Sequence, residues 1–480
     1  MPTTRINNRL VKNTAVAKDV PDVVTTKSNA KVKETHLNKK EFKKCSEPLK
    51  KAPKEIECPI KSYINTRIGD LILTCGTGEQ IGHGERNTTK KPRGIMDSLP
   101  VDIVDIAAGG VHSVMLTSSG EIYSCGINEK GTIPLPCGRE EEDSITEFSR
   151  LSFNPEIQSL GKFVSVAAGA SFTAVLTELG SVLLWGDMRD AGGEMTEHSV
   201  FENLRQGINI IVDHRKGNVI SKIACGENHI ICLGQHGELF TFGDPTKGQL
   251  GRVRATDSVR QCHYYGDNSG AKIRVPKMIK KGKVIKFKNV FAGGYWSAAI
   301  TNEGHVYVCG LNNYDQLGFK ADIETKYAEN RIPSFKRSEN FEKNGLEITH
   351  FTGSQHIAVR YNNGEVWVIG RNIDNALGLG TWRGNNDEDN WKSDNTIKLH
   401  LKLKMAGVTA GLGCSVAWTE DGRAFSWGAD TSGQLGLGIN DDDEKMVTKP
   451  KEITSKHLED KQIFKASISD NHCIFLADDA

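Results

Sequence analysis

Long apolar runs are missing from this chain of 480 residues. No stretch reaches the roughly 18 apolar residues that a membrane-spanning helix needs, and the N-terminus lacks the pattern of a secretory signal peptide. The sequence therefore predicts a protein that neither spans a membrane nor is secreted by that route.

Paired cysteine motifs and enzyme signatures are missing as well. The eleven cysteines are scattered and never spaced as Cys-x-x-Cys, which predicts reduced thiols rather than disulfides or a zinc site. Several, such as Cys75, Cys125 and Cys309, stand directly before a glycine of the repeat, where small core residues are expected. The chain has no Walker loop, no Gly-x-Ser-x-Gly elbow and no His-rich metal spacing. We therefore expect no metal, no cofactor and no covalent catalysis.

Glycine, by contrast, recurs in a fixed pattern. A first glycine is followed by a second eleven residues later and by a third six residues after that. Successive triplets start 57 to 67 residues apart, and such regularity predicts tandem copies of one structural unit. The six triplets lie at positions 109/120/126, 169/180/186, 226/237/243, 293/304/310, 353/364/370 and 411/422/428.

Each copy has the chemistry of a strand, a hairpin and a second strand. The residues between the glycines are β-branched, aromatic or small. The middle glycine usually follows a polar residue, as in Ser119-Gly120 and Asp421-Gly422, which is typical of a tight turn with positive φ. One unit cannot bury both of its faces, so radial stacking into a β-propeller is expected. An open solenoid of hairpins, the alternative, would need capping repeats.

The two ends of the chain supply complementary halves of a seventh unit. Residues 464–479 match the first half, with Ser469 in place of the first glycine, and residues 70–76 match the second half. We therefore predict an all-β fold, a seven-bladed β-propeller over residues 68–480. The pairing of residues 70–76 with the C-terminal blade would close the ring and remove its edges.

The first 67 residues differ in kind, because they hold 16 Lys/Arg against 7 Asp/Glu and few large apolar residues. Such a segment cannot bury enough apolar surface to fold alone, so we predict a disordered basic tail over residues 1–67. Its clusters resemble a nuclear import signal or a phosphate-binding arm, although a merely solvated linker is the alternative. The clustered lysines are Lys39, Lys40, Lys43, Lys44, Lys50, Lys51 and Lys54.

After residue 67 the chain is acidic, with 45 Lys/Arg (61 − 16) against 53 Asp/Glu (60 − 7), but one segment of it is basic. Residues 252–288 carry eleven Lys/Arg, among them Arg252, Arg254 and Arg260, against two Asp. This stretch lies in the longest gap between triplets, after the third. It is a candidate contact with nucleic acid or with a histone surface.

One column of the repeat is rich in histidine. The residues three positions after each first glycine are His112, Phe172, His229, Trp296, His356, Cys414 and His472. A repeat column usually serves packing or a repeated hydrogen bond. The alternative is a ring of side chains around one mouth of the channel, because the column points to the same face in every blade.

The repeat text resembles the regulator of chromosome condensation family. The text begins with Ala-Gly-x-x-His-Ser/Thr. The glycine of Asp/Glu-Gly follows eleven residues after the first glycine, and the glycine of Trp-Gly follows six residues after that. The resemblance covers about residues 70–480. It implies a guanine nucleotide exchange factor for the small GTPase Ran that stabilises the nucleotide-free GTPase. It also implies a nuclear, chromatin-associated protein that binds nucleosomal histones and DNA and serves nucleocytoplasmic transport and mitosis. An import receptor would bind the basic tail.

The resemblance further implies a short β-wedge that is pressed against the GTPase near its phosphate-binding loop. In this sequence the wedge would run over residues 187–194 and include Asp187, Arg189 and Asp190. Gly192 and Gly193 suit a tight protruding turn.

Residues at the channel mouth would contact Ran in this family. His356 and His472 match that pattern, whereas Ala170 and Asn228 stand where the family has acidic residues. Glu227, next to Asn228, is a candidate substitute.

Other propellers of this kind have different functions. The main alternative is a non-catalytic scaffold for chromatin or protein contacts. A substrate-recruiting domain of a ubiquitin ligase would be joined to a catalytic domain, and none is expected after residue 480. A tryptophan-based ultraviolet sensor would need many interior tryptophans, and this chain has seven.

Overall fold

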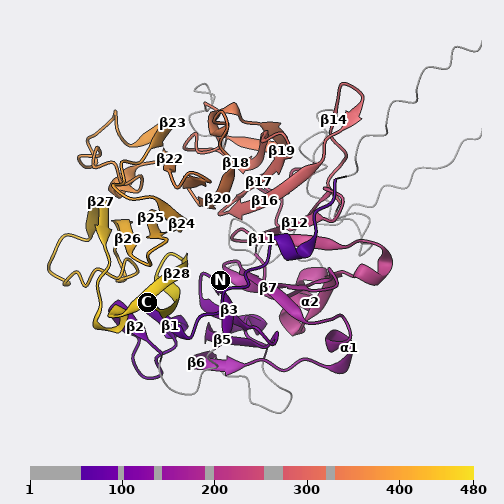
Figure 1. Ribbon diagram of the computed structural model, residues 1–480, viewed down its shortest axis with the longest axis horizontal. Coiled ribbons are helices and arrows are strands. Elements are labelled where there is room, and N and C mark those ends of the chain that lie inside the picture. The colour runs from indigo at the N-terminus through magenta and orange to yellow at the C-terminus, as the bar shows by residue number, and fades with distance from the viewer. Residues whose placement is uncertain (1–55, 96–101, 135–142, 190–198, 253–273, 321–329) are drawn as a thin grey trace, which may run out of the picture. The chain divides into compact units, whose positions relative to one another are not determined.

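Seven antiparallel sheets are arranged around a central axis (Figure 1). The computed structural model describes residues 56–95, 102–134, 143–189, 199–252, 274–320 and 330–480. Six of these sheets have four strands, and the seventh has three in the described residues. The seven-bladed β-propeller predicted from the glycine repeat is therefore confirmed.

The first four blades in chain order are labelled A to D. Blade A contains β3 (Ile103–Ala108), β4 (His112–Thr117), β5 (Ile122–Ile127) and β6 (Ser144–Arg150). Blade B contains β7 (Phe163–Ala168), β8 (Ser171–Thr177), β9 (Val182–Asp187) and β10 (Asn209–Val212). Blade C contains β11 (Ile220–Cys225), β12 (His229–Gly234) and β13 (Leu239–Gly243). Blade D contains β16 (Phe287–Gly293), β17 (Trp296–Thr301), β18 (Val306–Leu311) and β19 (Arg331–Arg337).

Blades E to G complete the ring. Blade E contains β20 (Ile348–Gly353), β21 (His356–Tyr361), β22 (Val366–Arg371) and β23 (Lys392–Lys398). Blade F contains β24 (Met405–Ala410), β25 (Cys414–Thr419), β26 (Ala424–Ala429) and β27 (Met446–Glu452). Blade G combines β28 (Lys461–Ile468) and β29 (His472–Asp479) with β1 (Leu71–Thr77) and β2 (Thr88–Gly94).

Helices are short and lie in the connections. The α-helices are α1 (Pro155–Gln158) and α2 (Ser199–Gln206). The 3-10 helices are η1 (Ile60–Ser62), η2 (Glu79–Ile81), η3 (Glu129–Gly131), η4 (His214–Lys216), η7 (Glu339–Phe341), η8 (Ile373–Asn375) and η9 (Lys456–Leu458). Within the described residues, no helix has the length and apolar character needed to cross a membrane.

The ring closes between the two ends of the chain. β1 pairs antiparallel with β29, from Leu71 opposite Ala477 to Gly76 opposite His472. The first strands of neighbouring blades are in contact all the way round, from β3 through β7, β11, β16, β20 and β24 to β28 and back to β3. The predicted pairing of residues 70–76 with the C-terminal blade is confirmed, and these first strands line the channel.

The repeated glycines serve different physical needs. The hairpin glycine has positive φ, for example 88° at Gly120, which side chains rarely tolerate. The first glycine of the triplet is needed for space, because a Cβ on Gly226 would lie 2.7 Å from the carbonyl oxygen of Gly293 in the next blade. The spacing that defines the repeat in the sequence thus sets both the turns and the approach of neighbouring blades.

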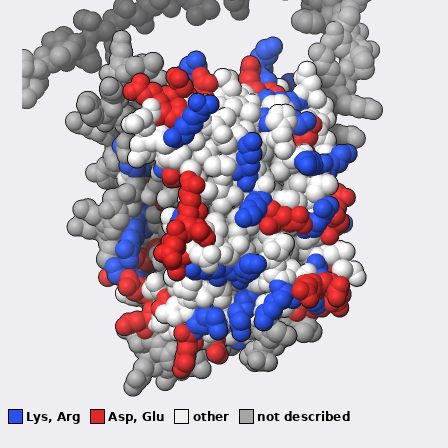
Figure 2. All heavy atoms as spheres, turned by 90° about the vertical axis from the view of Figure 1, so that its left-hand side faces the viewer, with Lys and Arg blue, Asp and Glu red and all other residues white. Residues whose placement is uncertain are grey.

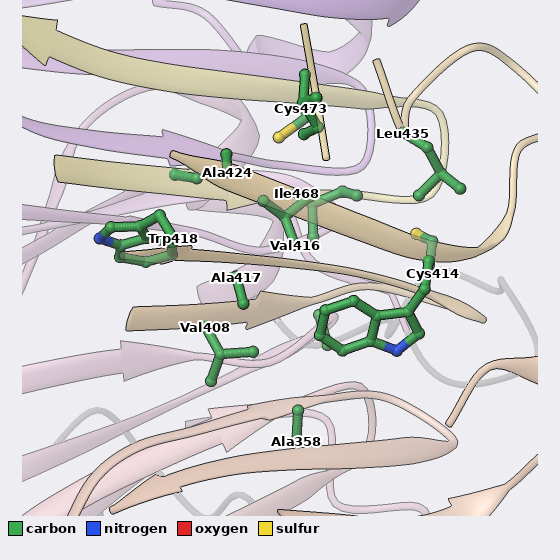
Figure 3. Packing of buried hydrophobic residues seen from close by; sticks show 14 of the residues in the cluster. Ala358, Val408, Cys414, Val416, Ala417, Trp418, Ala424, Leu435, Ile468 and Cys473 are labelled. Atoms are coloured by element: carbon green, nitrogen blue, oxygen red, sulfur yellow. The ribbon is translucent and has the colours of Figure 1, made fainter. Parts of the chain in front are cut away.

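The core lies between the blades. In the largest cluster, Val416 and Trp418 of β25 pack with Val408 of β24, Ala358 of β21 and Ile468 of β28, as Figure 3 shows. Side chains from three successive blades thus form one continuous apolar layer, whose burial is the main stabilising contribution to such a fold.

The predicted tail boundary at residue 67 is wrong, because residues 56–67 pack on the propeller. We call this segment the strap. Cys58 is 2% exposed, its N–H donates to Gln235 O at 2.8 Å, and the Ser221 hydroxyl donates to its carbonyl. Basic composition concealed the apolar anchors of the strap. Residues 1–55, including the clustered lysines, lie outside the described residues.

Candidate partner-binding faces of the propeller

The propeller has two different ends. The loop face is formed by the connections between the first and second strand of each blade. The hairpin face, at the other end, carries the turns of the middle glycines. On the loop face, backbone hydrogen bonds join the connections of blades A to D. Val111 N–H donates to Ala170 O at 3.1 Å, and Ala170 N–H donates to Glu227 O at 2.7 Å. Glu227 N–H in turn donates to Gly294 O at 2.9 Å. Backbone hydrogen bonds thus tie the connections of neighbouring blades together and fix the side chains that they carry.

The histidine column is buried beneath the loop face. His356 and His472 are both 0% exposed. His356 Nε2 lies 2.8 Å from Ser415 Oγ in the next blade, and His472 Nε2 lies 2.8 Å from Ser113 Oγ across the closure of the ring. His112 makes the same contact with Thr173 at 2.8 Å. The column therefore bonds blade to blade and differs from the alternative of a ring at the channel mouth.

Burial also fixes the charge of these imidazoles. Desolvation lowers the pKa of His356 to about 4, with a smaller contribution from Arg371, and lowers the pKa of His472 to about 3. Neutral rings are thus favoured at neutral pH. A role of His356 and His472 in exchange stays a prediction, and it would act through the loops that they hold.

Glu227 occupies the loop face as the sequence suggested. Its carboxylate accepts a hydrogen bond from Ser354 Oγ at 3.1 Å. Burial raises the pKa of Glu227, and the nearby charge of Asp470 adds to this, while hydrogen bonds from Tyr295 and Ser354 oppose it. Asp470, which is exposed, accepts from Leu412 N–H at 3.2 Å. Two carboxyl groups from different blades therefore form an acidic pair on this face.

The base of the predicted wedge is anchored by ion pairs. Asp187, at the end of β9, has a fully buried side chain that pairs with Arg189 and, at 2.6 Å, with Arg205 Nε from α2. Asn228 Oδ1 accepts from Arg189 N–H at 3.0 Å, so the residue that departs from the family pattern holds the chain where the wedge begins. Asp190, Gly192 and Gly193 lie outside the described residues.

The basic segment divides into buried and exposed parts. Arg252 bonds to Thr241 of β13 through its side-chain Nε at 3.0 Å, so its guanidinium serves the fold rather than a free surface. Arg254 and Arg260 lie outside the described residues. Further along, β14 (Ile279–Lys280) and β15 (Lys283–Val284) form a hairpin that projects from the ring (Figure 1). Its Lys280, Lys281 and Lys283 are exposed.

This hairpin lies beside the start of the strap. Ile56 and Tyr63 of the strap pack in the same apolar cluster as Met278 and Ile285, which flank the hairpin. The start of the strap at Ile56 therefore lies beside the base of the hairpin that carries these exposed lysines. The outer wall on the side of β23 and β27 is different, because Figure 2 shows basic and acidic side chains interspersed there.

A family model for the RCC1-like domain matches residues 71–475. The chain belongs to this family. The regulator of chromosome condensation of Xenopus laevis is 34% identical over 416 residues, which cover 85% of this chain and 90% of that protein.

Solved structures of this family have the same fold. A structure of yeast RCC1 (Prp20) bound to Kap60 has a TM-score of 0.74 at 21% identity, covering 92% of this chain and 97% of the other. Prp20p from Saccharomyces cerevisiae, described with its binding properties to Gsp1p and histones, has a TM-score of 0.70 at 21% identity, covering 87% and 93%.

Three residues of the loop face were not identified from the sequence. Asp470 occupies the same repeat position as Glu227, and Tyr295 the same repeat position as Asn228. Aligning the repeats on their glycines could therefore have identified both residues. Arg205 carried no such signal, because it reaches Asp187 from a helix outside the repeat.

Proposed function

We propose that this RCC1-family protein is a guanine nucleotide exchange factor for Ran that works on chromatin. The observation that carries the proposal is the acidic pair Glu227 and Asp470 on the same face as the anchored base of the wedge. A propeller that binds nucleotide-free Ran more tightly than nucleotide-bound Ran must weaken nucleotide binding by the same factor. No covalent step is required.

The wedge would act on the phosphate site of the GTPase. Arg189 is held at its backbone by Asn228 and at its side chain by Asp187. A rigid base lets residues 187–194 press on the loop and magnesium site that hold the nucleotide. The acidic pair would attract a basic GTPase surface and speed the encounter.

The opposite, basic elements would keep this activity on chromatin. The base of the lysine-bearing hairpin packs beside the start of the strap, and the lysine-rich tail directly precedes the strap in the sequence. This supports a shared contact with DNA phosphates and acidic histone surfaces. The same tail would bind a nuclear import receptor, in keeping with a nuclear location.

The exchange reaction can be tested by release of labelled GDP from purified Ran. We expect the wild-type protein to accelerate release. Glu227→Gln combined with Asp470→Asn should lower the apparent kcat/KM about tenfold, which corresponds to about 1.4 kcal/mol of weaker binding. The matched control is Glu459→Gln, an exposed carboxylate two residues before β28, on the hairpin face. No acceleration by the wild type would leave a scaffold as the function.

Chromatin binding can be tested separately with nucleosomes at two salt concentrations. Replacing the hairpin lysines with glutamine should weaken binding and reduce the salt dependence, by about 0.9 in the log–log slope for each DNA phosphate that is no longer neutralised. Unchanged affinity and slope would refute a role of the hairpin. The substitutions are Lys280→Gln, Lys281→Gln and Lys283→Gln.

A further inference from the structure

A girdle of mostly polar residues surrounds the channel at one level. In every blade the first strand has a β-bulge at the same point of its pairing with the second strand. The residue directly after the bulge is paired again, and it is this residue that belongs to the girdle. Because the first strands are innermost and share this register, the seven residues are equivalent positions around the axis. We call them the channel girdle: Asp105, Ser165, Lys222, Asn289, His350, Gly407 and Lys465.

Members of the girdle bond to their neighbours. Lys465 forms an ion pair with Asp105, whose carboxylate also accepts from Ser165 Oγ at 3.3 Å. Lys222 Nζ donates to Asn289 Oδ1 at 2.7 Å and lies 4.1 Å from the centre of the Phe291 ring. Among the described residues, no ion pair to a carboxylate is seen for Lys222, whose ammonium has three N–H groups to satisfy.

The basic members also act on one another across the axis. Burial lowers the pKa of Lys222 to about 7, and repulsion by Lys465 adds to this. Burial lowers the pKa of His350 to about 3, helped by Arg360, Lys222 and Lys465. Lys222, His350 and Lys465 come from blades C, E and G, which are not neighbours, and they hold equivalent positions on the innermost strands, so this repulsion acts across the channel.

The group has an excess of positive charge. Within the girdle, Lys465 is cationic and Asp105 is the carboxylate, while Lys222, with a pKa of about 7, is close to half protonated at neutral pH. Arg360 of β21, next to the girdle, adds a further cation. Arg360 is 9% exposed and donates to Met405 O at 2.6 Å. Burial lowers the pKa of Arg360, and the negative charge of Glu420 partly opposes this. Positive charge that is removed from bulk water without a counter-charge is costly, and a bound anion would offset that cost.

The girdle lies close to a covered end of the channel. Tyr63 of the strap donates to Lys288 O in blade D at 2.6 Å, and Asn65 donates to Val104 O in blade A at 2.7 Å. These carbonyls directly precede Asn289 and Asp105, so the strap crosses the hairpin-face end of the channel beside the girdle. Ser165, Lys222, Asn289, His350 and Lys465 nevertheless keep part of their surface accessible to water. A water molecule can thus reach each of these side chains.

We propose that the channel girdle binds one small inorganic oxyanion of the phosphate class, held by Lys222 and Lys465. Ser165 and Asn289 supply further hydrogen-bonding groups at the same level. The anion supplies the negative charge that the girdle lacks and links blades C and G across the axis. This site is independent of GTPase exchange, since it lies inside the channel and uses none of the residues assigned to the loop face or the wedge.

The test uses the full chain in buffer free of phosphate and sulfate. Equilibrium dialysis with radiolabelled inorganic phosphate should give one bound phosphate per chain. Phosphate should also raise Tm by about 2–5 °C in a saturable manner, and sodium chloride of equal ionic strength should not. Lys222→Met should abolish both effects, whereas the control Lys280→Met, on the exposed hairpin, should retain them. Absence of phosphate binding to the wild type, or retention of the bound phosphate by Lys222→Met, would overturn the proposal.

A second variant keeps the proposal testable if Lys222→Met fails to fold. Asn289→Asp places a carboxylate next to Lys222 without a change of size, so the protein carries its own counter-charge. We expect a higher Tm than wild type in phosphate-free buffer and no further rise when phosphate is added. A Tm that is unchanged or lower without phosphate, or a full phosphate response in this variant, would contradict the proposed charge excess.

Discussion

Acidification should strongly destabilise this propeller well before its carboxylates are protonated, because its buried histidines resist protonation. The perturbation is a change from pH 7.5 to pH 5.5. Burial lowers the pKa of His112 and His356 to about 4 and of His229 and His472 to about 3, from an ordinary value of 6.5. Below pH 6.5 the unfolded chain therefore takes up protons that the folded chain does not, so stability is lost as the pH falls.

The size of the effect follows from the number of such histidines. At pH 5.5, one unit below the pKa of an unfolded histidine, each one costs about 1.4 kcal/mol. The four column histidines together cost about 6 kcal/mol, and His83 and His350, with pKa values lowered to about 4 and about 3, bring the total to about 8 kcal/mol. Such a loss is comparable with the whole stability of many folded domains, about 5–15 kcal/mol.

Urea unfolding at pH 7.5, 6.5 and 5.5 measures this loss. His472→Gln removes one buried titrating group, so below pH 6.5 its stability should fall less steeply with pH, by about 1.4 kcal/mol per unit. His400→Gln is the control, because His400 is exposed and makes no blade-to-blade bond in the described structure. A wild-type loss under about 2 kcal/mol between pH 6.5 and 5.5, or identical slopes for His472→Gln and wild type, would refute the reasoning.

Three further predictions concern the closure, the wedge and the tail. Gly76→Ala should lower the free energy of unfolding by more than about 2 kcal/mol, because φ is 121° there and the new Cβ would lie 2.3 Å from Asn471 O. The control is Gly345→Ala, at φ 73° with open space around it, which should cost only about 1 kcal/mol in the same urea titration. Asn228→Ala should remove the bond to the Arg189 backbone and slow GDP release from Ran several-fold, with a change in Tm of only a few degrees; an unchanged release rate would show that the bond is not needed. Deletion of residues 1–54 should weaken nucleosome binding most at low salt, and equal affinities at low and high salt would argue against an electrostatic role.

The repeat determined most of what the sequence could predict about the fold. The glycine spacing fixes which residues are equivalent, so it predicted the pairing of residues 70–76 with the last blade, and the pairing of His472 with Gly76 repeats that of His112 with Gly126. Blade C departs from the pattern. Residues 253–273 of this blade lie outside the described part of the chain, and after them an isolated bridge joins Phe240 to Arg274, where other blades have a regular fourth strand.

The candidate site was predicted less well, because side-chain burial is not encoded in repeat spacing. His356 and His472 share a column that points to one face, but both rings are buried. Each ring is hydrogen-bonded to a serine of the next blade, which stands one residue after the column position there. Arg252 belongs to a basic stretch, yet its guanidinium bonds to Thr241 within the ring. Charge along the sequence thus predicted the character of the segment but not the orientation of each side chain.

The closure of blade G also has a consequence for synthesis of the chain. β1 ends at Thr77 and its partner β29 begins at His472, about 400 residues later. At a synthesis rate of about 5–20 residues per second, roughly 20–80 s pass between the synthesis of β1 and the synthesis of β29. Throughout that time the apolar edge of β1 is unpaired and open to wrong partners. The synthesis of β29 therefore decides when the molecule becomes a ring, and a nascent chain that stalls before His472 exposes this edge to chaperones.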